Sequence, residues 1–297
     1  MRTDLDHLPL SKRLLLEAIV RIIFEEFETA LALSTQPWKK RARILKVILY
    51  GSYARGGWVD DPIGGYTSDF DLLVIVDDER LTDFELWEGA RDRLMRDHLV
   101  TKRLKAPVSL IVHSLADVND QLTRGRPFFV DIARDGIALY ECTRRPLARP
   151  GNMLAESAFA EALIHFEEWF PSAIHRFDLA RTAIAKGYWK EAAFDLHQVT
   201  ERLYHCTLLV LKLYSPRSHN LKFLRSQSEA IVPELAEAWP RTDRASRRCF
   251  ELLYDAYVKA RYSPHYTIGE AELRWLVERV TALQALVGAA CERHLAR

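Results

Sequence analysis

The sequence predicts an α+β fold in two parts. These are an N-terminal α/β domain with a short mixed sheet over residues 1–145, and an all-α helical bundle over residues 153–297. Three observations lead to this prediction. Short runs of β-branched and aliphatic residues punctuate the first part. The segment 143–152, TRRPLARPGN, holds two prolines and one glycine and is typical of a linker. Nearly everything beyond it has helical periodicity.

The elements of the first part follow from local patterns. Residues 11–34 predict an amphipathic helix, with Ser11 as its N-cap and Pro37 just beyond its end. Residues 83–100 also predict a helix. Four apolar runs predict the strands of the sheet, at 43–50, 70–76, 108–112 and 136–141.

The second part predicts a bundle. Over 188–213, apolar residues recur at alternating spacings of four and three, which is the stripe of one continuous helix. Further helices are expected at 242–261 and 268–295, and Pro171 is expected to start or kink one. A polar ridge of His197, Glu201 and His205 runs beside the stripe. Metal binding is one interpretation, and a solvated or interface ridge is the favoured one.

Composition excludes several classes of protein. Of the 297 residues, 48% are hydrophobic and 28% charged, as in a soluble globular protein, and a formal net charge of +1 argues against a grossly basic nucleic-acid binder. The four cysteines form no CxxC pair, which indicates buried thiols in a reducing cytoplasm. No apolar run approaches the roughly 20 residues of a membrane span. Glu17 and Arg21 interrupt the apolar stretch where a signal peptide would need one. We therefore expect a cytoplasmic protein without a membrane partner.

The segment LYGSYARGGWVDDPIGGYTSDFDLLVIV, residues 49–76, carries the clearest chemistry. Alternation along a strand puts Asp69 and Asp71 on one face, and two close carboxylates repel unless a cation lies between them. Mg²⁺ prefers carboxylates together with substrate phosphates. Gly51 and Ser52 form a turn after a strand, where backbone amides and a hydroxyl can meet a phosphate. A phosphate-binding turn beside a metal-binding pair of carboxylates is typical of enzymes that transfer phosphoryl or nucleotidyl groups.

The stretch GSYARG…SDFDLLV closely resembles the signature of the minimal nucleotidyltransferases of the polymerase β superfamily, over roughly residues 40–142. The resemblance implies that Gly51 and Ser52 bind the nucleoside triphosphate and that Asp69 and Asp71 hold Mg²⁺. It also implies that Arg55 reaches the phosphates, and Ser68, within the same signature, is assigned to nucleotide binding.

That family normally has a third carboxylate on a later strand, but the corresponding strand here, PVSLIVHS, has none. Its polar residues are Ser109 and His113, and His113 is the substitute base that we name as catalytic. A structural role for a strand-end histidine is the alternative. Asp131, expected on a helix and at the surface, is a further candidate.

The second part resembles the HEPN domain, most specifically in AAFDLHQVTERLY and AYVKARYSPHY, over roughly residues 155–290. Some HEPN domains are ribonucleases in which four to six residues stand between an arginine and a histidine. Here three residues separate Arg261 from His265, which departs from that pattern. Together with Tyr262 and Tyr266 these residues are expected to line a cleft, since tyrosine and arginine stack on bases and contact phosphates. The alternative is that the tyrosines cap the core of the bundle.

These observations predict a Mg²⁺-dependent nucleotidyltransferase that moves NMP, expected to be AMP from ATP, onto an acceptor hydroxyl of a protein, an RNA end or a small molecule. Separately encoded relatives pair as toxin and antitoxin, and the helical part is expected to border the acceptor site or form a homodimer. Two alternatives remain open. One is a HEPN ribonuclease with a regulatory transferase domain, and the other is a nucleotide-binding protein without catalysis.

Overall fold

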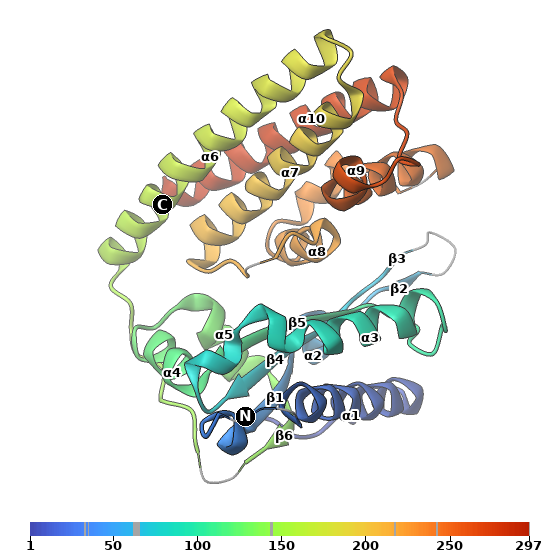
Figure 1. Ribbon diagram of the computed structural model, residues 1–297. Coiled ribbons are helices and arrows are strands. Elements are labelled where there is room, and N and C mark those ends of the chain that lie inside the picture. Colours follow the sequence, from blue (N-terminus) through green and yellow to red (C-terminus); the bar gives the residue numbers. More distant parts are fainter. Residues whose placement is uncertain are drawn as a thin grey trace. The chain divides into compact units, whose positions relative to one another are not determined.

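The computed structural model describes residues 1–32, 34, 36–61, 66–142, 145–216, 218–241 and 243–296. The chain divides into two compact units, Met1–Met153 and Leu154–Arg297. The first holds a small mixed sheet with helices and the second is helical, which confirms the predicted fold class (Figure 1). Part of the glycine-rich loop, residues 62–65, and the start of the expected linker, residues 143 and 144, lie outside the described residues.

The sheet of the N-terminal unit has the strand order β5-β4-β1-β6. The central pair, β1 (Ile44–Tyr50) and β4 (Phe70–Val76), is antiparallel and buried along its whole length. On either side, β6 (Ile137–Glu141) is antiparallel to β1, and β5 (Val108–Ser114) is parallel to β4. Strands buried on both faces read as continuous apolar runs, which is why β1 and β4 were visible in the sequence. The outer strands β5 and β6 are only partly buried, and shorter runs of aliphatic residues predicted them. Two short strands, β2 (Asp60–Asp61) and β3 (Tyr66–Thr67), form a separate hairpin.

One face of this sheet packs against α1 (Leu10–Ala32), whose apolar stripe joins the main hydrophobic core through Leu16, Ile19 and Ile23. Helix α5 (Pro127–Asp135) lies against the other face, where the ring of Phe128 meets that of Tyr50 edge-on at 5.7 Å. The remaining helices of the unit are α2 (Gly51–Arg55), α3 (Glu88–Leu99) and α4 (Leu115–Thr123).

The first helix begins one residue earlier than predicted, and Ser11 is not its N-cap. The amides of Lys12 and Arg13 donate to the carbonyl of Pro9, so Ser11 lies inside the first turn. Proline holds a helix-compatible φ and its own missing donor costs nothing at this position, which explains the earlier start.

The helical unit is a bundle built around α7 (Trp189–Lys212). Helices α6 (Ala155–Ala185), α8 (Leu221–Ile231), α9 (Arg244–Tyr262) and α10 (Glu270–Leu295) all pack against α7. Pro171 does not start a helix, which was one of the two expectations for it, because α6 runs through this residue without a break. The ridge of His197, Glu201 and His205 is not solvated, since all three side chains are buried. A central helix has no free face, so polar residues beside its apolar stripe are covered as well.

Within the described residues, no helix is long and apolar enough to cross a membrane. All four cysteines carry free thiols, and three of them are buried.

Candidate functional site

The turn at Gly51 joins β1 directly to α2. Gly51 has φ +73°, in the left-handed region that favours glycine. A Cβ atom built on Gly51 would lie 2.1 Å from Oδ2 of Asp71, which leaves no room for any side chain. Glycine is therefore required twice here, for its backbone conformation and for the close approach of a carboxylate.

The two aspartates lie where that turn meets β4. Asp71 is the register partner of Tyr50, the last residue of β1, and Asp69 immediately precedes β4. Both carboxylates are buried, with 3% and 8% of their residue surfaces exposed. The strand pairing therefore places Asp71 against the Gly51 turn, and Asp69 lies two residues before Asp71.

Ser109 completes this group from the neighbouring strand. In the parallel pairing of β4 with β5, Ser109 is the register partner of Asp71. Its buried hydroxyl donates a hydrogen bond of 2.8 Å to Oδ2 of Asp69. Ser109 thus stands on the later strand where the resemblance expects a third carboxylate, and it contacts the first carboxylate directly.

His113 does not lie with the aspartates. Its register partner is Ile75, four residues along the strand from Asp71, which is a separation of about 13 Å at 3.3 Å per residue. Its Nδ1 lies 2.6 Å from the carboxylate of Asp117, and its ring meets Phe129 edge-on at 5.3 Å. The placement of His113 in the catalytic group is therefore corrected: a local contact with α4 holds this histidine at the far end of β5.

Asp131 lies on α5, as expected, and its carboxylate forms an ion pair of 2.9 Å with Arg134. Its side chain is partly exposed, at 29%.

Ser68 and Arg55 flank the site in different ways. The amide of Val59 donates to the hydroxyl of Ser68 at 2.9 Å, and the amide of Ser68 donates to the carbonyl of Val59 at 2.8 Å. Ser68 therefore fastens the strand that carries Asp69 to the segment after α2. Arg55 is exposed at the end of α2. The pKa of Asp135 lies below its usual range mainly because of the hydrogen bond from Arg134, and the charge of Arg55 adds to this effect.

A second group in this unit, around Lys12, was missed by sequence reasoning. Its Nζ atom donates to Oδ2 of Asp60 at 2.9 Å and to the hydroxyl of Tyr53 at 3.2 Å. The ring of Tyr53 stacks on Phe70, the residue between the two aspartates, with centroids 4.2 Å apart. Burial alone would lower the pKa of Lys12, but the bonds to Asp60 and Tyr53 outweigh it and raise that pKa. The signal in the sequence is a lysine four residues before Leu16, on the buried stripe of the helix.

In the helical unit, Arg261 and Tyr262 lie at the exposed end of α9. The Arg261 guanidinium lies over the rings of Phe194, Tyr257 and Tyr262, at 4.7 to 5.0 Å from the centroids. Its Nε donates to the carbonyl of Tyr257 at 2.7 Å. Tyr262 is 73% exposed. Both side chains are therefore accessible to a ligand.

Tyr266 and His265 follow after the helix end and differ in burial. Tyr266 is 4% exposed, and its hydroxyl donates to the carbonyl of Leu252 at 2.9 Å. Burial raises the pKa of Tyr266. His265 is exposed. The predicted cluster is thus divided, because Tyr266 closes the core of the bundle while the other three residues reach its surface.

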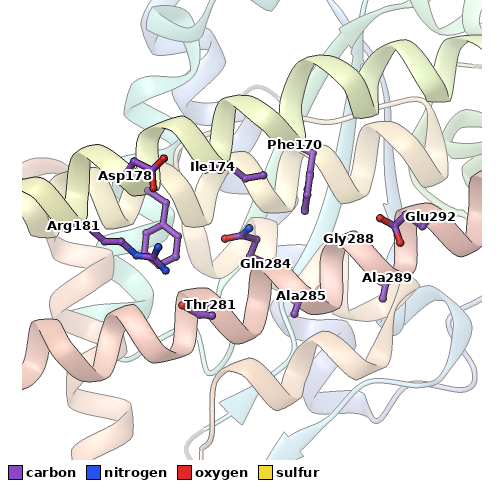
Figure 2. Close-up of a pocket in the computed structure, with 11 residues that line it drawn as sticks. Phe170, Ile174, Asp178, Arg181, Thr281, Gln284, Ala285, Gly288, Ala289 and Glu292 are labelled. Carbon is purple, nitrogen blue, oxygen red and sulfur yellow. The ribbon is translucent and has the colours of Figure 1, made fainter.

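Two further observations bear on ligands, the first on all the described residues and the second on the helical unit. Among the described residues, no group of three or more histidine, cysteine, aspartate or glutamate side chains is arranged to hold a metal ion. A groove of about 450 Å³ lies between α6 and α10 (Figure 2). It combines apolar residues such as Phe170 and Ile174 with polar ones such as Gln284, and none of the predicted site residues lines it.

The comparison with protein families identifies the helical unit. The family model of the HEPN domain matches residues 166–289, a stretch that includes all of α7, α8 and α9. The match supports a HEPN domain in the helical unit, and it covers none of the N-terminal unit. A search of the curated proteins found no match to the chain.

Proposed function

We propose that the N-terminal unit is a nucleotidyltransferase that moves NMP, with ATP as the expected donor, onto an acceptor hydroxyl. The observation that carries this proposal is the burial of Asp69 and Asp71 against the Gly51 turn, with no space for a side chain at residue 51. Two buried carboxylates on one strand face are costly without a positive charge between them, so this donor set fits Mg²⁺.

In this proposal Asp69 and Asp71 hold the metal ion. When bound, Mg²⁺ would neutralise charge on the phosphates and on the departing pyrophosphate. The hydroxyl of Ser52 and the backbone amides of the turn at Gly51 bind phosphate oxygens beside the two carboxylates. Arg55, exposed at the end of the same short helix, supplies a guanidinium to the phosphates.

With Ser109 in place of a carboxylate, a different group must accept the proton of the acceptor hydroxyl. A serine hydroxyl is a poor base at neutral pH, unlike the carboxylate that the resemblance expects on this strand. Its role here is to orient Asp69 through the 2.8 Å hydrogen bond. The acceptor hydroxyl then loses its proton to one of the two aspartates or to water. We expect slow transfer to ordinary alcohols, and faster transfer to acceptors with a more acidic hydroxyl.

The test is pyrophosphate release from each NTP in the presence of Mg²⁺ and a cell extract. Asp69→Asn combined with Asp71→Asn is expected to abolish release without unfolding the chain. The matched control is Asp77→Asn with Asp78→Asn, two carboxylates just beyond the other end of the same strand, and it is expected to leave release unchanged. Undiminished release from the Asp69 and Asp71 variant would refute the proposal.

RNA cleavage by the helical unit is the second candidate, and the HEPN match favours it. The geometry of Arg261 weakens that candidate, because this guanidinium folds back onto Tyr257 on its own helix. We expect the purified protein not to cut RNA. Metal-independent cleavage that disappears in His265→Ala would contradict this expectation and favour the ribonuclease.

A further inference from the structure

The segment that leads from α3 into β5 is basic. Residues 96–105, RDHLVTKRLK, hold four lysine or arginine residues and a single acidic one, Asp97. Asp97 is buried, and its carboxylate accepts a hydrogen bond of 3.1 Å from Thr101. Arg103 and Lys105 are exposed, and neither forms an ion pair with another residue that the structure describes. The charges of these two side chains are therefore available to a ligand.

The backbone of this segment is held in place by the core. Leu104 and Ala106 are buried in the same hydrophobic cluster as Leu110 of β5. The amide of Leu104 also donates a hydrogen bond of 3.0 Å to the carbonyl of Asp97 near the end of α3. Because exposed residues alternate here with buried ones, Arg103 and Lys105 both lie on the outer side of a fixed backbone.

The basic segment ends at the candidate site. The carbonyl of Pro107 accepts a hydrogen bond of 2.8 Å from the amide of Phe70, the residue between the two aspartates. Two residues further along, Ser109 contacts Asp69. Lys105 lies two residues before Pro107, so their Cα atoms are at most about 7 Å apart. The long, flexible side chain of this lysine can therefore reach a ligand that lies beside the carboxylates.

The strand order places the basic segment and the Gly51 turn on opposite sides of the carboxylates. Strand β4 lies between β1, which ends at the turn, and β5, which the basic segment enters. In an in-line displacement at phosphorus, the attacking and leaving oxygens lie on opposite sides of the phosphorus atom. With the phosphates of the donor at the Gly51 turn, as proposed above, the acceptor approaches from the β5 side and meets Lys105 and Arg103.

We propose that the acceptor is the end of a single-stranded RNA, whose phosphates bind Arg103 and Lys105 while its terminal ribose lies beside Asp69 and Asp71. This inference rests on the proposed nucleotidyl transfer and names its acceptor. A nucleic-acid strand carries a negative charge on every nucleotide, so a strand of any sequence can meet both cations in turn. A peptide does so only where acidic residues have a suitable spacing.

The chemistry of the terminal ribose also suits this site. A ribose hydroxyl beside a second oxygen is more acidic than an isolated alcohol, which matters where Ser109 replaces a carboxylate base. In the proposed step the oxygen of this hydroxyl forms a bond to the α-phosphorus of ATP. The bond from that phosphorus to the bridging oxygen breaks, and pyrophosphate leaves with the electron pair. The proton passes to one of the two aspartates or to water, and the RNA gains one AMP.

The first experiment measures binding in the absence of transfer. The full chain, in EDTA and without nucleotide, is titrated into a short fluorescein-labelled single-stranded RNA, and Kd is measured by anisotropy at several salt concentrations. Arg103→Gln combined with Lys105→Gln is expected to weaken binding. It is also expected to reduce the slope of log Kd against log salt by about 1.4, because each phosphate contact on a single strand contributes about 0.7.

The matched control is Lys40→Gln combined with Arg41→Gln. These two cations are exposed and precede β1, whose other end carries the Gly51 turn. The control removes the same charge from the unit and is expected to keep the slope of the parent. All four substituted residues are exposed, so both double variants are expected to keep the melting temperature of the parent.

The second experiment measures transfer of label from ATP to the same RNA in Mg²⁺. The Arg103 and Lys105 variant is expected to raise KM for RNA by roughly tenfold or more, in line with the loss of two charge-assisted contacts, at unchanged KM for ATP. The inference is overturned if this variant keeps the salt slope of the parent. It is also overturned if an acidic peptide containing tyrosine is labelled and the RNA is not.

The two experiments separate this inference from the proposed function. Pyrophosphate release with other acceptors, but without RNA binding, would overturn the RNA acceptor and leave nucleotidyl transfer standing. RNA binding that depends on Arg103 and Lys105, without pyrophosphate release from any NTP, would support the RNA surface and refute the transfer.

Discussion

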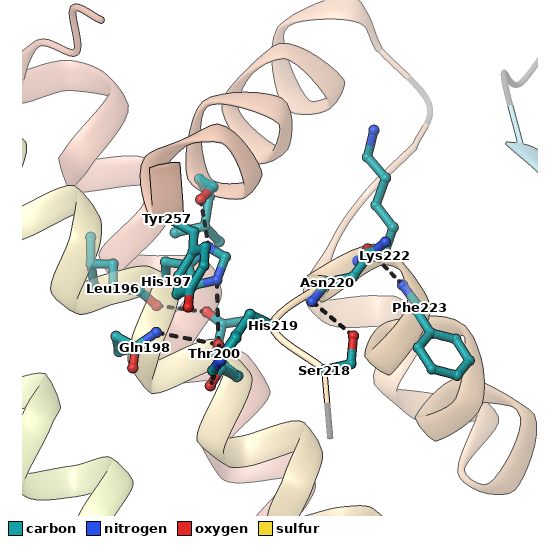
Figure 3. A network of polar contacts seen from close by, with 12 residues as sticks. Leu196, His197, Gln198, Thr200, Ser218, His219, Asn220, Lys222, Phe223 and Tyr257 are labelled. Atoms are coloured by element: carbon teal, nitrogen blue, oxygen red, sulfur yellow. Dashed lines mark hydrogen bonds and ion pairs between the residues drawn. The ribbon is translucent and has the colours of Figure 1, made fainter. Parts of the chain in front are cut away.

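The two units assemble their polar groups in contrasting ways. In the N-terminal unit, Gly51, Ser52, Asp69 and Asp71 come from 21 consecutive residues, joined by one turn and one strand pairing. In the helical unit, the buried carboxylate of Glu201 on α7 contacts His197 on the same helix and His219 on the segment before α8 (Figure 3). His197 in turn contacts the carbonyl of Leu253 on α9, 56 residues away in the sequence. A site built by local backbone geometry is visible as a motif, whereas a site built by helix packing is not.

The largest expected effect comes from a substitution at the Gly51 turn, which tests whether local backbone geometry shapes the N-terminal site. Gly51→Val requires a branched residue to adopt φ +73°, a conformation that costs on the order of 1–3 kcal/mol. Its Cβ would also displace the carboxylate of Asp71. Displacement of a reacting group by about 1 Å costs roughly 100-fold in rate, so we expect at least that loss in pyrophosphate release.

Gly57→Ala is the matched control for Gly51→Val. Nothing lies within 4 Å of a Cβ built on Gly57, and its φ is outside the left-handed region. This variant is expected to keep full activity and the parent melting temperature. Equal activity of both glycine variants would show that the turn does not shape the site.

Local patterns also explain what could be predicted and what could not. The central strands β1 and β4 were visible because each is a mainly apolar run buried along its whole length, and shorter aliphatic runs marked β5 and β6. The pairing of Ser109 with Asp71 depends on the parallel register of β4 and β5, which no short-range pattern determines. His113 was misplaced for the same reason, since a strand sequence does not show which end meets the neighbouring turn. The burial of His197 depends on helices far away in the sequence.

Lys12 tests whether the N-terminal site also depends on distant support. Lys12→Met keeps the length of the side chain but removes the bonds to Asp60 and Tyr53. Hydrogen bonds to charged groups contribute about 1.5–3 kcal/mol, so we expect a loss of stability at the lower end of this range, because Asp60 is half exposed. We also expect added Mg²⁺ to increase the rate of transfer less in this variant than in the parent. The reason is that the hairpin of β2 and β3 leads directly to Ser68 and Asp69. Lys40→Met, at an exposed lysine, is the control and is expected to be neutral.

The pH dependence of stability gives an independent measure of the same contact. The pKa of Lys12 is raised in the folded chain, so the charged form is favoured by folding. Its contribution is complete below the pKa of the unfolded chain and is lost as pH rises through the folded value. The free energy of unfolding, measured in urea at pH 8 and again above pH 10, should therefore change less between the two conditions for Lys12→Met than for the parent. A parallel decline in both proteins would contradict a stabilising role for the charge.

The smallest effect separates packing from binding at the end of α9. Tyr266→Phe removes a buried hydroxyl and leaves the carbonyl of Leu252 without that donor, which costs about 1 kcal/mol. Tyr262→Phe, at the exposed tyrosine of the same cluster, is expected to leave the midpoint of urea unfolding unchanged. If Tyr262 meets a ligand, its variant changes ligand use at constant stability, whereas Tyr266→Phe changes stability alone. Loss of nucleotide or acceptor use in Tyr266→Phe at unchanged stability would contradict the packing role. It would show that Tyr266 acts in one site with the other three residues of its motif, Arg261, Tyr262 and His265.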